Sequence, residues 1–148
     1  MSPGDIDSKV VSQRALWILQ MMDSIKDLRL GEEDSFLADR HKIAAAESYL
    51  RRSLEALFDI GRHILAKKFA YPATEYKEIA KGLSENKILV ENEAELMRKM
   101  AGYRNRMVHF YHEITPEELR EICLYHLDEI KFLSDKLVQW VRAQNKQL

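Results

Sequence analysis

The feature that most constrains this chain is a long apolar stripe at helical spacing between Asp39 and Phe69. Its members recur every three or four residues, so they share one face of an α-helix. They are Ile43, Ala46, Leu50, Leu54, Leu57, Gly61 and Ile64. The pattern predicts one long helix, in which Gly61 would let a neighbouring helix approach closely. We expect the helix to end before Pro72, because the residue before a proline disfavours the α conformation.

The segment before this helix predicts another helix, which begins near Asp7 or Ser8 and ends by Gly31. Its buried face carries Val11, Ala15, Ile18, Met22 and Ile25. Further apolar residues lie off that face, namely Leu16, Trp17, Leu19 and Met21. A helix with two apolar faces either lies deep in a core or meets a partner. The polar residues Glu32–Ser35 are expected to separate the two helices.

The second half of the chain predicts a short helix and then a long one. Thr74 is a candidate cap for a short helix from Glu75 to about Leu83. After a connection, Asn92 or Glu93 opens the next long helix. Its apolar stripe is Leu96, Met100, Tyr103, Met107 and Phe110.

The run from Thr115 to Glu118 predicts the start of a last long helix, because it combines a capping residue, a proline at the first helical position and an early glutamate. This helix carries Cys123, Leu127, Ile130, Leu133, Leu137 and Trp140. The sequence therefore predicts an all-α fold, a bundle of four long helices with one short accessory helix, formed as a single domain by residues 1–148.

Composition excludes several classes of protein and site. The formal net charge of −1 argues against a dedicated DNA-binding protein, because neutralising phosphates usually requires a basic excess. The single cysteine, Cys123, rules out an internal disulfide framework and a cysteine-based zinc site. We expect it to be a buried apolar residue. The chain has no signal-peptide pattern and no apolar run near the roughly 20 residues of a membrane span, so a cytoplasmic location is expected.

The segment from Gly102 to Tyr111 carries polar residues that the apolar pattern does not explain. Arg104, Asn105, His109 and Tyr111 offer a fixed cation, an amide, an imidazole and a phenol. On a regular helix Arg104 and Tyr111 share one line, while Asn105 and His109 share another line about 140° away. Either the helix ends or distorts within this segment, or a second copy of the chain completes each site in a two-fold dimer.

The spacing Arg104-x4-His109-x-Tyr111 resembles the R-x4-H-x-Y motif of the HepT-like toxin ribonucleases of the HEPN superfamily. The residues around it also resemble that family's usual surroundings; they are Gly102, Asn105, Arg106 and Val108. The resemblance extends over nearly the whole chain. It implies a HEPN-like helical bundle and a metal-independent endoribonuclease that acts as the toxin of a toxin–antitoxin pair.

By the same resemblance, Arg104 and His109 are the catalytic pair. The residue types suit that chemistry, because RNA supplies its own nucleophile in the 2′-hydroxyl. His109 can take or deliver a proton near neutral pH, and Arg104 can hold the phosphate in a bidentate fork. Asn105 could orient the phosphate or His109. The implied partner is a minimal nucleotidyltransferase antitoxin, which neutralises the toxin by transferring AMP to Tyr111.

Other interpretations of these residues stay open at this stage. The chain could be a catalytically silent helical module that binds the nucleotidyltransferase, or a nucleotide-binding accessory subunit of that enzyme. His109, His112 and Glu113 suggest a metal site by spacing, but no HExxH pattern is present, so we expect neither metal nor cofactor. Beside RNA and the antitoxin, we expect a second copy of the chain as a partner, forming a homodimer, and no membrane.

Overall fold

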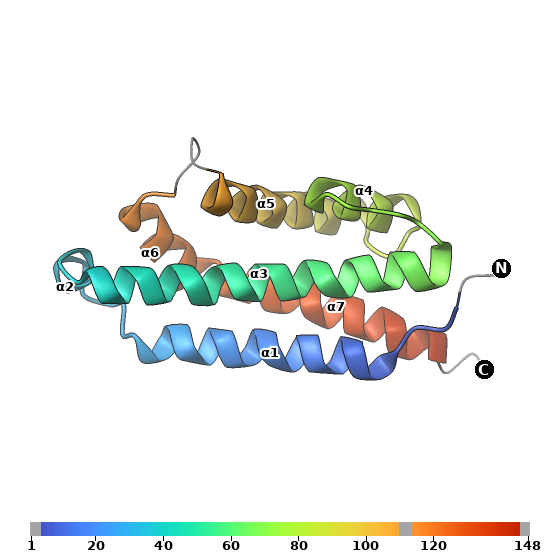
Figure 1. Ribbon diagram of the computed structural model, residues 1–148, viewed down its shortest axis with the longest axis horizontal. Coiled ribbons are helices and arrows are strands. Elements are labelled where there is room, and N and C mark those ends of the chain that lie inside the picture. The colour runs from blue at the N-terminus through green and yellow to red at the C-terminus, as the bar shows by residue number, and fades with distance from the viewer. Residues whose placement is uncertain (1–3, 110–113, 146–148) are drawn as a thin grey trace.

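The computed structural model describes residues 4–109 and 114–145, which form helices with no strand among them. In chain order the helices are α1 (Ser8–Asp27), α2 (Glu33–Leu37), α3 (Arg40–Phe69), α4 (Tyr76–Glu85), α5 (Glu91–Val108), α6 (Pro116–Tyr125) and α7 (Leu127–Asn145). Figure 1 shows α1 and α3 lying side by side in opposite directions, with α5 and α4 forming the layer above α3. The all-α bundle expected from the sequence is confirmed.

The long helix α3 has the place in the bundle that its stripe predicts. Asp39 caps it by accepting hydrogen bonds from the backbone N–H groups of His41 and Lys42. It ends at Phe69, after which Ala70 takes the left-handed conformation. Of the stripe residues, only Ile43 is half-exposed and the others are fully buried. The helix contacts each of the other six described helices, so it is the axis of the bundle.

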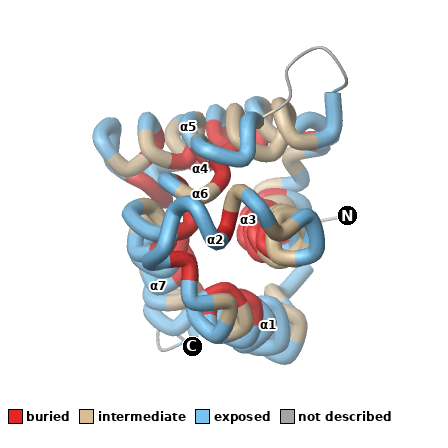
Figure 2. The backbone as a smooth tube through the Cα atoms, turned by 90° about the vertical axis from the view of Figure 1, so that its left-hand side faces the viewer, coloured by how far each residue is buried: buried red, intermediate tan, exposed pale blue. Residues whose placement is uncertain are grey.

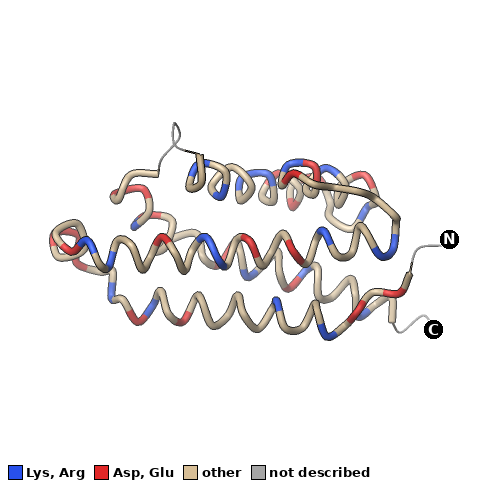
Figure 3. Tube along the Cα trace, viewed as in Figure 1, with Lys and Arg blue, Asp and Glu red and all other residues tan. Residues whose placement is uncertain are grey.

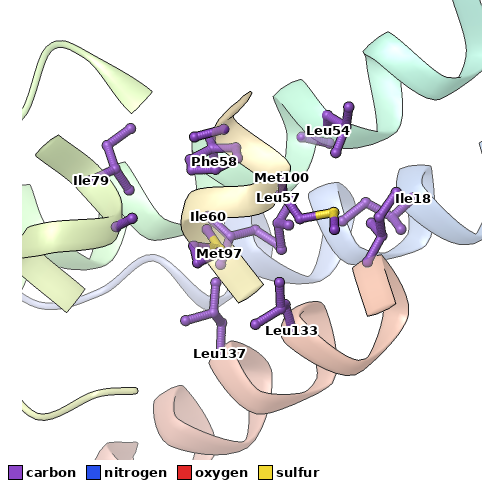
Figure 4. Packing of buried hydrophobic residues seen from close by; sticks show 14 of the residues in the cluster. Ile18, Leu54, Leu57, Phe58, Ile60, Ile79, Met97, Met100, Leu133 and Leu137 are labelled. Atoms are coloured by element: carbon purple, nitrogen blue, oxygen red, sulfur yellow. The ribbon is translucent and has the colours of Figure 1, made fainter. Parts of the chain in front are cut away.

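The hydrophobic core lies where four helices, α1, α4, α5 and α7, converge on α3. Figure 4 shows Ile18 of α1, Leu57 of α3, Ile79 of α4, Met97 of α5 and Leu133 of α7 gathered around one centre. All five side chains are fully buried. In the end-on view of Figure 2, the buried residues of each helix face the interior of the bundle, and the exposed residues face outward. The apolar faces predicted from the sequence therefore meet in one continuous core.

The prediction of one last long helix is wrong in one respect, because this part of the chain forms two helices, α6 and α7, which are separated at His126. The apolar spacing continues across the break, from Leu119 and Ile122 in α6 to Leu127 and Ile130 in α7, so periodicity alone does not reveal it. The physical reason is that α6 packs on α2 and α3, whereas α7 packs on α1, α3 and α5. The break lets the two halves reach different partners.

A second correction concerns the polar residues that follow α1. The first helix ends at Asp27, inside the predicted limit of Gly31, and Arg29 then adopts a positive φ of 53°. The stretch expected to be only a separator contains the short helix α2. Phe36, which is 1% exposed, anchors α2 in the core, and burial of this ring explains why a polar segment folds there.

The helix starts in the second half differ slightly from those predicted. Thr115 caps α6 as expected, since its hydroxyl accepts a hydrogen bond from the N–H of Glu118. The prediction that Thr74 caps α4 is wrong, because the N-cap is Glu75. The start of α4 is instead stabilised by the Glu78 carboxylate, which accepts from the Thr74 N–H at 3.2 Å. Helix α5 begins at Glu91, one residue before the predicted start.

Two expectations about apolar residues have different outcomes. Cys123 is buried as predicted, and burial raises the pKa of its thiol to about 12. On the second apolar face of α1, Met21 is buried, but Leu16 is 56% and Trp17 is 37% exposed. That face therefore does not lie deep in the core of one chain. No helix in the described ranges is long and apolar enough to cross a membrane.

The close approach of α3 and α4 at Gly61 gives a stability prediction. A Cβ at this position would lie 2.9 Å from Cγ2 of Ile79 and 3.1 Å from Cδ1 of Leu83. We expect Gly61→Ala to lower the free energy of unfolding by about 1–3 kcal/mol, as overpacked cores do. Urea unfolding followed by circular dichroism measures the change.

Gly102→Ala is the matched control for that substitution. Gly102 also lies within a helix, but apart from that helix's own backbone no atom of residues 4–109 and 114–145 lies within 4 Å of a Cβ built there. It should raise the free energy of unfolding by about 0.5–1 kcal/mol, because alanine is the better helix former. Equal effects of the two substitutions would contradict the close packing at Gly61.

Candidate active site

The candidate site is built around a stack of three side chains from three helices. The Tyr76 ring at the start of α4 lies on the buried Phe58 ring of α3, with centroids 4.6 Å apart and planes at 13°. The guanidinium carbon of Arg104 in α5 lies 4.4 Å from the Tyr76 centroid. Because Phe58 covers one face of Tyr76, Arg104 lies over the other. The buried core thus extends outward through Tyr76 to a cation.

Glu55 of α3 holds the same guanidinium from another direction. Its Oε2 accepts a hydrogen bond from Nη2 of Arg104 at 3.2 Å, and its Oε1 accepts one from Nη1 of Arg51 at 3.1 Å. The side chain of Arg104 is 25% exposed, and its buried Nε has no hydrogen-bond partner among the residues that the structure describes. One face of the guanidinium stacks on Tyr76 and one of its edges pairs with Glu55. The side chain of Arg104 therefore has little freedom to rotate.

Burial also shifts the pKa values of two acidic groups around this stack, Tyr76 and Asp59. It raises the pKa of the Tyr76 phenol, and the neighbouring Arg104 only partly offsets that rise. The phenol is therefore neutral across the physiological range, and Tyr76 acts as an aromatic surface. Burial likewise raises the pKa of Asp59, although Arg14 and Arg62 oppose this by pairing with its carboxylate.

The end of α5 decides whether Arg104 and His109 can act together. The helix stops at Val108, and His109 takes an extended conformation with φ −96° and ψ 121° while its N–H donates to the Asn105 carbonyl. The sequence left open whether the helix ends or distorts in the motif segment or whether a second copy of the chain completes each site. The structure shows that the helix ends within this segment. Arg104, Asn105 and His109 consequently line one pocket, although a continuous helix would point the arginine and the histidine apart.

We call this hollow the Arg104 pocket. It has a volume of about 700 Å³ and is also lined by Arg62 of α3 and by residues 74–77 at the start of α4. Arg62 pairs with Asp59 at 3.3 Å, and its guanidinium carbon lies 5.8 Å from the Tyr76 centroid. The pocket places three cationic side chains and the Glu75 carboxylate around the His109 imidazole; the cations are Arg62, Lys77 and Arg104. This excess of positive charge suits a phosphate-bearing ligand.

Several predicted residues fall elsewhere. Arg106 forms an ion pair with Glu118 of α6, its Nη1 lying 2.7 Å from Oε2. His63 of α3 lies outside the site, and its Nε2 accepts a hydrogen bond from the Asp7 N–H at 3.0 Å. Tyr111, and the His112 and Glu113 of the metal hypothesis, lie outside the described residues. Within the described ranges, no three His, Cys, Asp or Glu residues are grouped as metal ligands.

No sequence pattern singles out three residues that shape this site. In the sequence, Tyr76 is an ordinary member of a short helix, and Glu55 and Arg62 are ordinary charges on the polar flank of a long one. Only the packing of the helices brings Tyr76 and Arg62 into the pocket and Glu55 onto the guanidinium of Arg104. The one sequence signal for these residues is that Glu55 directly follows the buried stripe residue Leu54. Many residues of ordinary surface ion pairs show the same pattern.

Comparison with known proteins gives one family and one curated relative. The model of the ribonuclease HepT-like family matches residues 18–137. The tRNA nuclease HepT of Aphanizomenon flos-aquae (strain 2012/KM1/D3) is 27% identical over 116 residues, which cover 78% of this chain and 78% of that protein.

Solved structures give the same fold. A tri-AMPylated HEPN toxin of Shewanella oneidensis, in complex with an MNT antitoxin, matches with a TM-score of 0.77 and 21% identity, covering 86% of this chain and 95% of that one. A toxin–antitoxin complex with AMP-PNP matches with a TM-score of 0.75 and 20% identity, covering 86% and 97%. At these identities the likeness establishes the helical architecture that the described residues adopt.

The stack of Tyr76 on Arg104 predicts an energetic coupling between the two side chains. A double-mutant cycle with Tyr76→Leu and Arg104→Met should give a coupling free energy of about 0.5–2 kcal/mol in urea unfolding. The loss of the Glu55 ion pair cancels, because it occurs in both arms that remove the arginine. The control cycle uses Lys136 and Phe132 of α7, which are 5.6 Å apart and both exposed. A coupling no larger than that of this control would show that the stack does not hold Arg104.

Proposed function

The chain belongs to the ribonuclease HepT-like family, and from that membership we propose that it is the toxin of a toxin–antitoxin pair and cleaves RNA internally without a metal ion. The observation that carries the proposal is the Arg104 pocket, because the two residues of the motif line it together. The 27% identical relative is a tRNA nuclease, so tRNA is the first RNA to test. We further propose that residues 1–148 act as one domain.

In the proposed reaction the RNA supplies its own nucleophile. The 2′-oxygen attacks the adjacent phosphorus, the bond to the 5′-oxygen of the next nucleotide breaks, and a 2′,3′-cyclic phosphate remains. His109 exchanges a proton with one of these two oxygens. Arg104 offsets the negative charge that builds on the phosphate oxygens. The Tyr76 stack and the Glu55 ion pair support this role by holding the guanidinium before the substrate arrives.

Asn105 has a supporting role in the proposal. Its carbonyl accepts the backbone N–H of His109 at 3.0 Å, which ties the imidazole-bearing residue to the end of α5. Its side chain lines the Arg104 pocket beside that of Arg104. An amide at this place can donate to a phosphate oxygen and accept from the imidazole.

The partners form the second part of the proposal. The antitoxin is a minimal nucleotidyltransferase that transfers AMP to Tyr111, and the tri-AMPylated state of the similar toxin from Shewanella oneidensis supports this. A nucleotide attached to Tyr111, two residues after the pocket residue His109 in the sequence, would add negative charge and repel RNA. We also propose a homodimer, supported by the exposed Leu16, Trp17 and Leu19 on the outer face of α1.

The catalytic proposal predicts the effect of removing either motif residue. Arg104→Ala and His109→Ala should each lower RNA cleavage by about 100-fold or more. The measurement is cleavage of labelled tRNA by protein produced without the antitoxin, in buffer with excess EDTA. Arg98→Ala and His41→Ala are matched controls, since Arg98 is half-exposed, His41 is exposed and neither lines the Arg104 pocket.

Each possible result of this assay has a definite meaning. Activity that disappears with EDTA would contradict metal independence. Activity that survives His109→Ala would contradict the role of the imidazole. Absence of cleavage by the wild type, together with tight binding of the antitoxin, would favour a catalytically silent binding module.

The regulatory proposal predicts a modification at one position. Co-expression with the nucleotidyltransferase should add one or more AMP masses to Tyr111 and abolish RNA cleavage. Tyr111→Phe should escape modification, because it lacks the acceptor oxygen, and it should keep nuclease activity, because Arg104 and His109 remain. Intact mass and peptide mapping measure the modification. Tyr125→Phe is a control, since Tyr125 is an exposed tyrosine on α6. An unmodified Tyr111 in the presence of active antitoxin and ATP would contradict this mechanism.

A further inference from the structure

A second hollow adjoins the Arg104 pocket. It has a volume of about 400 Å³ and is lined by Lys77 of α4 and by residues of α5, namely Gly102, Asn105, Arg106 and His109. We call it the Gly102 pocket. Lys77, Asn105 and His109 line both hollows, so the two form one groove that passes across His109. A reactive group in the middle of a groove leaves space for ligand on either side of it.

The α5 wall of the Gly102 pocket follows from helical geometry. Gly102, Asn105, Arg106 and His109 follow one another at intervals of three, one and three residues, so the first three share one face of α5 and His109 caps that face. Apart from the backbone of the helix itself, none of the described residues lies within 4 Å of a Cβ built on Gly102. The described part of the wall is therefore open at the glycine, and a larger residue there would project into the hollow.

The groove is predominantly cationic, and its cations differ in how they are paired. Arg62 pairs with Asp59, Arg104 with Glu55 and Arg106 with Glu118. None of the ion pairs formed among the described residues includes Lys77. Figure 3 shows the basic positions distributed along α4 and α5. Lys77 is thus the groove cation with its charge most available to a ligand.

A substrate with one phosphate would need only the Arg104 pocket. A groove with a second hollow and an available ammonium beyond the histidine suits a chain of phosphates. Nucleotides fit such separate hollows when they can be splayed apart, which single-stranded RNA permits and a stacked duplex resists. A lysine that contacts the backbone holds any sequence, because it touches phosphate and reads no base.

We propose that the Gly102 pocket is a subsite for the nucleotide next to the cleaved bond of single-stranded RNA, with Lys77 binding its phosphate. The subsite rests on the proposed nuclease function, because it assumes that the cleaved phosphate lies between Arg104 and His109. It assigns a role in substrate binding to two residues outside the motif. Lys77 supplies affinity, and the missing side chain of Gly102 supplies room.

The test measures binding separately from cleavage. Fluorescence anisotropy of a labelled single-stranded RNA is recorded with His109→Ala protein, which leaves the RNA intact. Adding Lys77→Ala should raise the Kd about 10-fold, as loss of one charge-assisted contact does. The slope of log Kd against log salt should fall by about 0.7, the value for one phosphate contact on a single strand. Lys81→Ala is the matched control, because Lys81 lies on the same helix, pairs with Glu85 and lines neither pocket.

Substitutions at Gly102 test the shape of the subsite. Gly102→Trp should weaken binding of single-stranded RNA at least as much as Lys77→Ala does, whereas Gly31→Trp, at an exposed glycine that lines neither pocket, should leave it unchanged. Thermal melting of each variant confirms that the fold is intact. A blunt duplex of the same sequence should bind more weakly than the single strand to the parent protein.

The outcomes separate the subsite from the nuclease function. If Lys77→Ala and Gly102→Trp bind RNA like their controls while the wild type still cleaves in a His109-dependent way, the subsite is wrong and the function stands. If the duplex binds as tightly as the single strand, the single-strand assignment is wrong. If the wild type does not cleave RNA, the proposed function fails, and the binding measurements still decide whether Lys77 and Gly102 contact RNA.

Discussion

Burial of the apolar stripe on α3 is the constraint on which the rest of the structure depends. Each of the other described helices contacts α3, and the cluster of fully buried side chains contains residues from both of its ends, from Ala46 to Leu65. Burying side chains of this size gives about 1.5–3 kcal/mol each, so the stripe as a whole contributes more than any single exposed ion pair, which typically gives about 0–1 kcal/mol. The close approach at Gly61 then brings α4 against this helix, and α4 in turn packs on α5.

The candidate site is a direct product of that packing. Phe58 is a core residue of α3, and its outer face supports Tyr76, which supports Arg104. Glu55, one turn earlier on α3, binds the same guanidinium. The arginine proposed to stabilise phosphate charge is therefore held by the rigid centre of the bundle rather than by a loop. A site that needs little reorganisation can stabilise a transition state more effectively than a mobile one.

The near-neutral charge of the chain is compatible with a nucleic-acid substrate because the charges are distributed locally. Carboxylates that lower the net charge pair with the same arginines that line the groove, as in the Arg104–Glu55 and Arg106–Glu118 pairs. These pairs fix the geometry of the arginines while leaving Lys77 as a cation outside the ion pairs of the described residues. Binding of RNA would then depend on shape and on a few contacts, more than on a broad basic surface.

The sequence by itself determined the helical nature of the chain, the buried stripe of α3, the cap at Thr115 and the residues of the motif, because each of these depends on neighbours within one or two helical turns. Only the tertiary structure decided that α6 and α7 separate at His126, that Phe36 anchors α2, and that Tyr76 and Glu55 meet Arg104. It also decided that α5 ends at Val108, so that Arg104 and His109 line one pocket. Periodicity tells which face of a helix is buried, but it carries no information about which other surface covers that face. Contacts between residues as far apart as Glu55 and Arg104 arise only when separate helices pack.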